Sequence, residues 1–193
     1  MSAEIGVLAL QGDVAEHEDA LRGLGATPWR VLAAADLRGL NGLVIPGGES
    51  TTIGKLAVDY GLIEPLREFV ASGKPVLGTC AGLILLADDV GRDQPLVGGL
   101  DISVERNAFG RQVDSFESNV RLAGDDDSPF KGVFIRSPLV TAVGPAAEVF
   151  ARLEDGSVVG VRQGNVVGVS FHPELTGDPR VHQLALADAL PPS

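Results

Sequence analysis

The first half of the chain alternates continuous apolar runs with stretches in which apolar residues recur at helical spacing. Unbroken apolar runs are typical of parallel strands covered on both faces, because strands with one exposed face alternate apolar and polar residues. Such a run predicts a strand at residues 5–10; a short second strand is predicted at 29–32, a third, buried strand at 43–45 and a fourth at 75–78, with helices at 14–24, 52–59, 63–71 and 83–87. The alternation predicts an α/β fold of three layers, in which helices flank a mostly parallel central sheet.

Short strand-like segments replace this alternation in the second half. They are predicted at residues 102–106, 115–122, 132–135, 140–143, 149–153, 158–161 and 166–171, with a closing helix at 181–190. Residues 154–157 form a turn signal between two of these segments, which indicates a hairpin and therefore additional antiparallel strands. No linker or repeat divides the chain, so residues 1–193 are predicted to form one domain.

Composition and charge limit the classes of partner that the chain can bind and indicate its cellular compartment. The formal net charge of −11 makes nucleic acid and anionic membranes poor partners. The single cysteine excludes an internal disulfide framework and favours a reducing compartment. The N-terminal apolar run is too short for a signal or membrane segment and has no basic region before it, so a cytoplasmic protein is expected. The acidic run 125–127 is expected to be a solvated turn rather than a metal site.

The most informative position is Cys80, in the sequence Gly-Thr-Cys-Ala-Gly between a predicted strand and a predicted helix. A nucleophile at such a turn, with Gly78 and Gly82 two residues to either side, has the nucleophile-elbow pattern with sulfur in place of oxygen. The glycines suit a turn too tight for side chains, and the first N–H groups of the helix favour a thiolate. A lone cysteine is more often buried and inert, so this interpretation needs a base nearby.

One of the three histidines is suited to be that base. His172 follows the last predicted strand in the sequence Phe-His-Pro-Glu, and residues two apart in extended backbone point to the same side. Pro173 favours that geometry, so the Glu174 carboxylate can orient the His172 imidazole. By contrast, His17 is expected to be solvated on the polar face of the first helix, and His182 to lie at the surface.

A glycine pair at the end of the third predicted strand supplies a candidate oxyanion loop. Gly47 and Gly48 allow backbone N–H groups to turn inward, where one of them and the N–H of Ala81 can stabilise an oxyanion. A Gly-Gly loop alone also fits a phosphate cradle or a simple turn. Because the ends of parallel strands gather at one sheet edge, this loop is predicted to lie beside the Cys80 turn.

The motifs together resemble those of the class I, or triad, glutamine amidotransferases, a flavodoxin-like family, and more closely the glutaminase subunits of pyridoxal 5′-phosphate synthase. The stretches that carry the resemblance are Leu-Ala-Leu-Gln-Gly at 8–12, Leu-Val-Ile-Pro-Gly-Gly-Glu-Ser-Thr-Thr at 43–52, Gly-Thr-Cys-Ala-Gly at 78–82, Glu-Arg-Asn-Ala-Phe-Gly-Arg-Gln at 105–112, Phe-Ile-Arg at 134–136 and Ser-Phe-His-Pro-Glu-Leu at 170–175. The second and fourth are specific to the narrower group.

The resemblance implies hydrolysis of L-glutamine to L-glutamate and ammonia. Cys80 would attack the side-chain amide, His172 would act as base and then acid, and Glu174 would orient His172. The N–H groups of Gly48 and Ala81 would hold the oxyanion. The residues implied to contact glutamine are Gly48, Glu49, Ser50, Arg106, Ile135 and Arg136. Glu49 suits the α-ammonium of the substrate, and Arg106 or Arg136 suits its α-carboxylate.

The resemblance also implies a partner and no cofactor or metal. Ammonia would pass to a separate (β/α)8-barrel synthase subunit, within a large hetero-oligomer, that makes pyridoxal phosphate from a pentose phosphate and a triose phosphate. Gln11, Gly12 and Gly47 are predicted to form a loop that responds to this partner. Three alternatives remain open: a glutaminase of another amidotransferase, such as that of histidine biosynthesis; a partner-independent cysteine peptidase or γ-glutamyl hydrolase; and a catalytically silent regulatory module.

Overall fold

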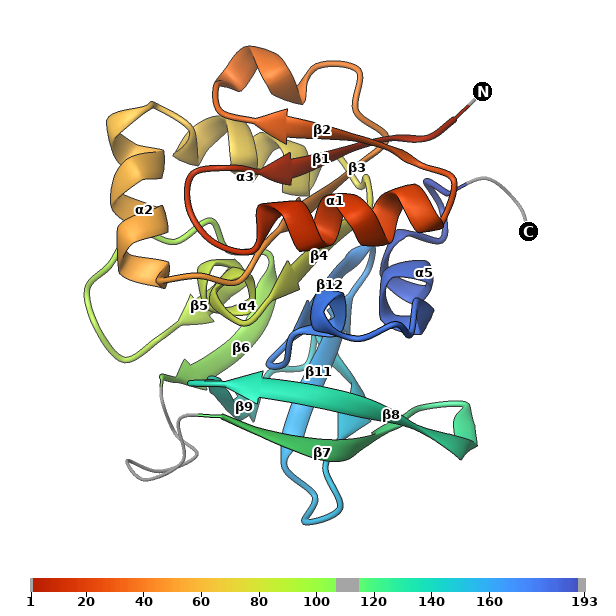
Figure 1. The fold of residues 1–193 in the computed structure, drawn as a ribbon. Helices are drawn as coiled ribbons and strands as arrows, with labels where there is room; N and C mark the ends of the chain where they lie inside the picture. The colour runs from red at the N-terminus through yellow and green to blue at the C-terminus, as the bar shows by residue number, and fades with distance from the viewer. Residues whose placement is uncertain (1, 107–114, 191–193) are drawn as a thin grey trace.

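The protein folds around one long mixed sheet, which Figure 1 shows running through the whole molecule. The structure, a computed structural model, describes residues 2–106 and 115–190. In these residues the first five strands of the long sheet are parallel and the last four are antiparallel. In spatial order they are β2 (Thr27–Val31), β1 (Glu4–Leu8), β3 (Gly42–Ile45), β4 (Val76–Thr79), β12 (Val166–Val169), β11 (Val158–Gln163), β10 (Glu148–Arg152), β7 (Ser115–Leu122) and β8 (Asp125–Ile135).

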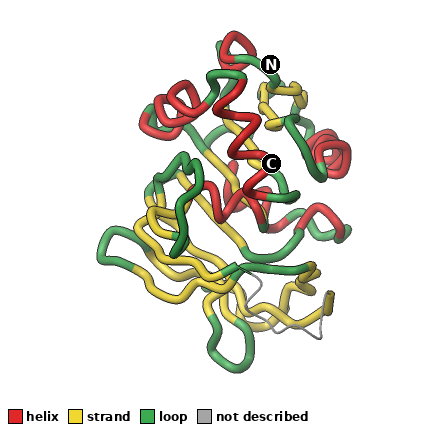
Figure 2. The backbone as a smooth tube through the Cα atoms, turned by 90° about the vertical axis from the view of Figure 1, so that its left-hand side faces the viewer, coloured by secondary structure: helices red, strands yellow, loops and turns green. Residues whose placement is uncertain are grey.

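Helices cover both faces of the parallel half, as Figures 1 and 2 show. On one face lie α2 (Ser50–Asp59), α3 (Ile63–Ala71) and α4 (Ala81–Leu86), with the short 3-10 helix η1 (Ala34–Leu37). On the other face lie α1 (Val14–Gly23) and α5 (Arg180–Leu186). Strand β3 shows why: Leu43 and Ile45 pack into the first core and Val44 into the second, since successive strand residues face opposite sides. The predicted three-layer α/β fold is confirmed.

A second, smaller sheet lies beside the antiparallel half. Among the described residues it has three strands, in the order β5 (Ala87–Asp89), β6 (Leu100–Glu105) and β9 (Leu139–Val143). Strand β5 was not predicted from the sequence, because it continues directly from α4 without a turn residue between them. The predicted additional antiparallel strands are therefore confirmed, and they are shared between two sheets.

Two local predictions were wrong. The acidic run 125–127 does not form the turn, because Gly124, with φ of 85°, takes the backbone conformation the turn needs, and β8 begins at Asp125. The Asp125 carboxylate pairs with Arg180 at 2.6 Å. The closing helix is also shorter than predicted, with α5 ending at Leu186. No helix in the described part of the chain is long and apolar enough to cross a membrane.

The order of strands brings three chain segments to the same sheet edge. Thr79 at the end of β4 pairs in register with Val169 at the end of β12, and Gly78 pairs with Ile45 at the end of β3. The residues that follow these strands, Cys80 among them, therefore leave the sheet side by side. This is the edge at which ligands bind in open parallel sheets.

Candidate active site

Cys80 occupies a strained turn between β4 and α4. Its φ of 49° and ψ of −101° are unusual for a residue with a side chain, and such a conformation costs roughly 1–3 kcal/mol. A Cβ at Gly82 would lie 2.0 Å from the carbonyl oxygen of Ile45, and one at Gly78 would lie 2.7 Å from the carbonyl carbon of Gly82. Both positions next to this turn thus exclude side chains, as the elbow pattern predicts.

The Cys80 thiol lies against the end of β8, the last strand of the long sheet. Its Sγ is 3.7 Å from the carbonyl oxygen of Ile135, and the residue is 6% exposed. The Cys80 N–H donates to Val169 O at 2.9 Å, which joins the turn to the end of β12. His172 lies just beyond β12, so this join brings the thiol next to the predicted base.

His172 is held between two carboxylates. Its Nδ1 lies 2.7 Å from Glu174 Oε1 and 3.2 Å from Asp13 Oδ2, which leaves Nε2 for the thiol. Its backbone N–H donates to Val133 O at 2.8 Å. His172 and Glu174 are both buried, and Pro173 begins the 3-10 helix η2 (Pro173–Leu175) that turns Glu174 back toward the ring.

The electrostatics of this group favour a protonated His172. Burial opposes the charge, but hydrogen bonds with Asp13, Cys80 and Glu174 outweigh it and raise the pKa of His172 to about 12. Burial also raises the pKa of Glu174, against the attraction of His172. An imidazolium between a sulfur and two carboxylates suits a thiolate nucleophile, and it can give its proton to a leaving group.

Asp13 is a site residue that the sequence analysis missed. It directly follows the Gln11-Gly12 pair after β1, at the same sheet edge as Cys80 and His172. That position was the available signal, because the carboxyl end of each parallel strand contributes to this edge.

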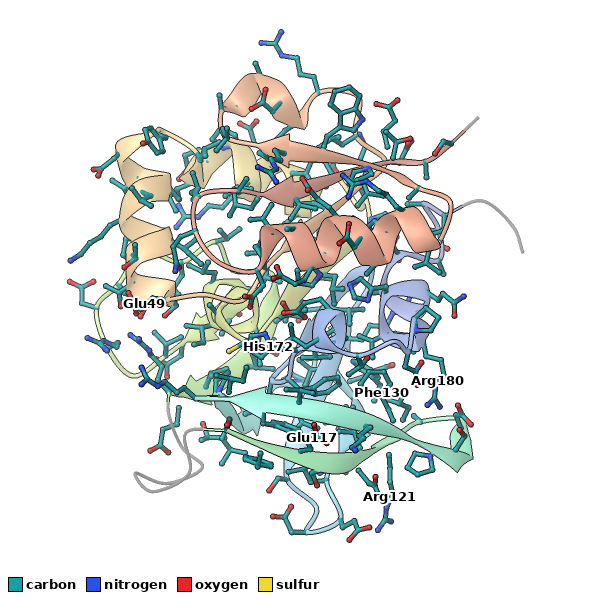
Figure 3. The ribbon with its side chains drawn as sticks, in the orientation of Figure 1. Glu49, Glu117, Arg121, Phe130, His172 and Arg180 are labelled. Carbon is teal, nitrogen blue, oxygen red and sulfur yellow. The ribbon has the colours of Figure 1, made fainter. Side chains whose placement is uncertain are left out.

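A cleft of about 380 Å³ opens over the thiol. It is lined by Gln11, Asp13, Gly48, Glu49, Ser50, Cys80, Ala81, Ile84, Arg106, Ile135, Arg136 and His172. The structure thus brings together the predicted nucleophile, base, oxyanion and substrate-binding residues, while Glu174, Gly12 and Gly47 lie behind the lining. Figure 3 shows Glu49 and His172 along this same edge. The predicted motif at 105–112 is described only as far as Arg106, and its remaining residues lie outside the described part of the chain.

Two of the predicted substrate-binding residues pair with each other. Arg106 Nη2 lies 2.8 Å from Glu49 Oε1, and Arg106 Nη1 donates to Thr51 Oγ1 at 2.9 Å. Glu49 also caps α2, accepting from the N–H groups of Thr51 and Thr52 at 3.1 and 2.7 Å. Burial opposes its charge, but the hydrogen bonds from Thr52, Thr51 and Arg106 lower the pKa of Glu49 to about 2.

The Gln11-Gly12 loop lies directly on the Gly47-Gly48 loop. Glu49 N–H donates to Gln11 Oε1 at 2.8 Å, and Asp13 N–H donates to Gly47 O at 3.2 Å. Gly12 has φ of 107°, and a Cβ there would lie only 1.7 Å from Gly47 O. The two loops are therefore joined by two hydrogen bonds and a close backbone contact.

The predictions for His17 and His182 were wrong. Both are fully buried, at 0% and 1% exposed, and they bond to each other through His17 Nδ1 and His182 Nε2 at 2.9 Å. His17 lies between Val14 and Leu21 at helical spacing, so it belongs to the buried face of α1. This mutual hydrogen bond offsets the cost of burying the two imidazoles.

Asp13, His172 and Glu174 also offer three ligand atoms within 4.8 Å of one another, a spacing that would suit a metal ion. Metal binding requires an unprotonated imidazole nitrogen. The raised pKa of His172 and its 2.7 Å hydrogen bond to Glu174 favour the proton instead. We therefore interpret the group as a hydrogen-bonded cluster.

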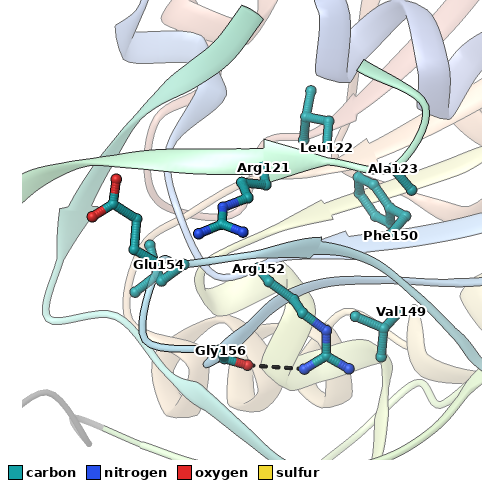
Figure 4. A pocket seen from close by; sticks show the side chains of 9 residues that line it. Arg121, Leu122, Ala123, Val149, Phe150, Arg152, Glu154 and Gly156 are labelled. Atoms are coloured by element: carbon teal, nitrogen blue, oxygen red, sulfur yellow. Dashed lines mark hydrogen bonds between the residues drawn. The ribbon is translucent and has the colours of Figure 1, made fainter. Parts of the chain in front are cut away.

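A second hollow, of about 290 Å³, lies between β7 and β10 (Figure 4). In it the Arg152 guanidinium donates to Gly156 O at 2.8 Å, with Arg121 and Glu154 nearby. Its lining has no histidine or cysteine. The cleft over Cys80 is the candidate active site because its lining holds both the nucleophile and the base.

Comparisons with known proteins show the family to which the chain is similar. A family model described as the SNO glutamine amidotransferase family matches residues 7–189. The curated pyridoxal 5′-phosphate synthase subunit PdxT of Frankia casuarinae is 58% identical over 183 residues, which cover 93% of this chain and 92% of that protein. The PdxT subunit of Streptomyces coelicolor is 57% identical, over 93% of this chain and 90% of that protein.

Solved structures agree as well. A crystal structure of a glutamine amidotransferase superposes with a TM-score of 0.90 at 51% identity, covering 96% of this chain and 98% of that one. The structure of PurLQS from Thermotoga maritima superposes with a TM-score of 0.75 at 17% identity, over 97% of this chain and 99% of that chain. The second likeness is one of fold alone.

Proposed function

The chain belongs to the SNO glutamine amidotransferase family, and from this premise we propose that it is the glutaminase of a pyridoxal 5′-phosphate synthase, hydrolysing L-glutamine to L-glutamate and ammonia. One observation carries the proposal: Cys80 lies in a strained turn and its thiol is next to His172. The Nδ1 atom of His172 is in turn hydrogen-bonded to Glu174 at 2.7 Å. The names of relatives at 57–58% identity favour this synthase over the glutaminase of histidine biosynthesis.

In the first half of the reaction, the Cys80 sulfur attacks the carbon of the glutamine side-chain amide. The C=O bond opens to an oxyanion, which the N–H groups of Gly48 and Ala81 stabilise. His172 then gives its proton to the amide nitrogen, the C–N bond breaks, and ammonia leaves. Cys80 is left as a γ-glutamyl thioester, and His172 as a neutral imidazole oriented by Glu174.

In the second half, water takes the place of ammonia. Neutral His172 removes a proton from the water as its oxygen attacks the thioester carbon. The same two N–H groups stabilise the second oxyanion, and its collapse breaks the C–S bond. The new γ-carboxyl group gives its proton to solvent, glutamate leaves, and the Cys80 sulfur and protonated His172 are restored for another cycle.

Glutamine recognition rests on the charged rim of the cleft. Glu49 offers a carboxylate for the α-ammonium of the substrate, and Arg106 and Arg136 offer guanidinium groups for its α-carboxylate. The Oγ of Ser50 is buried in the cleft wall and has no hydrogen-bond partner among the described residues, so it is available to the substrate. Ile135 and Gly48 complete the wall beside the thiol.

Ammonia released into water would be protonated and lost, so the family role implies direct transfer to a synthase subunit. We propose that this partner is a (β/α)8 barrel and that the two assemble as a large hetero-oligomer in the cytoplasm. Docking would act on the Gln11-Gly12 loop, which is linked to Gly47 and Glu49 by the two hydrogen bonds described above. Movement of this loop would turn the Gly47-Gly48 peptide so that Gly48 N–H faces the oxyanion. We also propose that residues 1–193 act as one domain. The two hydrophobic cores support this, because they lie on opposite faces of the same sheet.

The test is ammonia release from L-glutamine, measured with and without the barrel synthase subunit, for the wild type and Cys80→Ala. We expect activity that depends on the partner and is abolished by Cys80→Ala. A Cys80→Ala protein that keeps wild-type activity would overturn the mechanism. A wild-type chain that is as active alone as in the complex would overturn the role of the Gln11-Gly12 loop. Thermal unfolding of both proteins controls for folding.

A further inference from the structure

A chain of buried polar side chains continues from the triad into the interior. Glu174 bonds His172 through Oε1, while its second oxygen, Oε2, lies 3.4 Å from His17 Nε2. His17 Nε2 is also 3.1 Å from Thr79 Oγ1, and His17 Nδ1 is 2.9 Å from His182 Nε2. The contacts join α1, β4, η2 and α5, and every member of the chain is buried. A surface or solvated role for His17 is therefore excluded.

Both imidazoles are neutral in this environment. Burial first, and then the nearby His182 and His172, hold the pKa of His17 well below its usual range, and burial lowers the pKa of His182 to about 4. A neutral imidazole carries a single N–H, so each ring nitrogen is either a donor or an acceptor. The direction of every hydrogen bond in the chain then follows from where the His17 proton lies.

One of the two arrangements is less favourable. With its proton on Nδ1, His17 would donate to His182, and Nε2 would accept from Thr79 Oγ1 while its lone pair lies 3.4 Å from the Glu174 carboxylate. His182 would then carry its own proton on Nδ1, which is buried and has no partner among the described residues. A buried N–H without an acceptor is rarer and costlier than an acceptor without a donor.

The other arrangement satisfies both ends. His182 Nε2–H donates to His17 Nδ1, and the proton of His17 lies on Nε2, where it faces Thr79 Oγ1 and Glu174 Oε2. Only the lone pair of His182 Nδ1 is left without a partner. The donor matters because Glu174 Oε2 has no hydrogen-bond partner within the described residues, and Asp13 adds a second negative charge close by.

We propose that His17 is a positioning residue of the glutaminase site: its Nε2–H faces the second oxygen of Glu174, and His182 keeps the proton on that nitrogen. The Nε2–H then lies 3.4 Å from Oε2 and attracts that oxygen without a hydrogen bond, while Oε1 stays directed at His172 Nδ1. The groups that face Glu174 are His172 from its own segment, and Asp13 and His17 from the start of α1. The role in catalysis rests on the proposed function, whereas the position of the proton does not.

The test compares two variants of similar size at one position. His17→Gln keeps an N–H donor near the place of Nε2, and His17→Leu removes it. The first readout is the pH dependence of Cys80 alkylation by iodoacetamide in the free chain. The second is kcat and KM for L-glutamine, as functions of pH, in the complex with the synthase subunit. Thermal unfolding of each variant reports on packing.

We expect the acid limb of both pH profiles to move up by roughly one pH unit in His17→Leu, because a lost donor to a carboxylate makes its protonation about tenfold easier. kcat near the acid limb falls by a similar factor, while KM for L-glutamine stays unchanged. His17→Gln restores most of the shift. Wild-type profiles in His17→Leu, or equal shifts in both variants, would overturn the proposal, since a packing role alone does not distinguish a donor from a methyl group.

The wild-type protein provides an independent test if His17→Leu does not fold. Nitrogen-15 NMR of the histidine rings assigns the protonated nitrogen directly. We expect Nε2–H at both His17 and His182, without titration between pH 6 and pH 8. Protonation of His17 at Nδ1 would overturn the proposal. If the wild-type complex releases no ammonia but the alkylation profile still shifts in His17→Leu, the proposed function fails and the coupling of His17 to Cys80 stands.

Discussion

Replacing Gly82 by alanine is expected to destabilise the protein and displace the nucleophile. A Cβ at this position would lie 2.0 Å from Ile45 O and 2.9 Å from the carbonyl carbon of Ile45. Ordinary contact begins near 3.4 Å, so α4 would have to move away from β3 by roughly 1.4 Å. The obstacle is backbone, which cannot change rotamer as a crowded side chain can.

The size of the effect follows from this geometry. Overpacking in a well-packed core costs about 1–3 kcal/mol, and a backbone obstacle places Gly82→Ala at the upper end, about 3 kcal/mol. For a chain of this length, that corresponds to a decrease in Tm of roughly 6–12 °C. Movement of α4 also carries the Ala81 N–H away from the cleft. We therefore expect weaker stabilisation of the oxyanion in addition to the lower stability of the fold.

The assay is urea unfolding of the wild type, Gly82→Ala and a matched control, Gly23→Ala. Gly23 lies at the end of α1, and a Cβ there would meet no atom within 4 Å. The control should be unchanged or more stable by roughly 0.4–1 kcal/mol, because alanine restricts the unfolded chain. A free energy of unfolding for Gly82→Ala within about 0.5 kcal/mol of the wild type, together with unchanged Cys80 alkylation, would refute the steric argument.

Three further predictions concern charges of the site. The pKa of His172 is raised to about 12 from 6.5, so its contribution to stability is fully present below pH 6.5 and is lost as the pH rises toward 12. In Glu174→Gln the pKa of His172 should be raised less, so urea unfolding should show a smaller alkaline loss that is complete at a lower pH; identical profiles would contradict the assigned partner. Asp13→Asn removes the more distant carboxylate, so kcat for glutamine should fall less than in Glu174→Gln, and the reverse order would show that Asp13 is the main orienting acid. The pKa of Glu49 is lowered to about 2 from 4.5, so its contribution is present above pH 4.5 and is lost as the pH falls toward 2. Because the Glu49 side chain is about half exposed, Glu49→Gln should lower the free energy of unfolding by only about 0.5–1 kcal/mol at pH 7. The same variant should raise KM for glutamine while kcat changes little. A lower kcat at unchanged KM would show that Glu49 takes part in the chemical step instead.

The elements of the parallel half were predictable because each carries its own local signal. Apolar runs gave β1, β3 and β4, and the turn at Cys80 needed only the two glycines around it. Strand β5 was missed because nothing local separates it from α4. The turn at Gly124 was misplaced because three consecutive aspartates suggest solvent, whereas one glycine with positive φ was sufficient to make the turn.

The site residues also differ in whether a local sequence signal predicts them. Cys80, His172 and Glu174 were found from spacing within single segments, which the sequence displays directly. Asp13 and His17 depend on which helix face is covered and by what, and that is decided by distant segments: His17 contacts Thr79 and His182, which lie 62 and 165 residues away. The pairing of Glu49 with Arg106 is equally non-local, at 57 residues. Residue spacing therefore predicts the site residues that lie within one segment, whereas the contacts between distant segments are set by tertiary packing.

Strand β12 has a consequence for how the site comes into being. It lies between β4 and β11, so it is the strand that joins the parallel half of the sheet to the antiparallel half. Cys80 follows one of its neighbours, and His172 follows β12 itself. During synthesis, the thiol therefore emerges about ninety residues before its base. A chain that is still growing, or one that fails to insert β12, carries a cysteine but no imidazole beside it. The thiol therefore gains its base only when β12 completes the sheet.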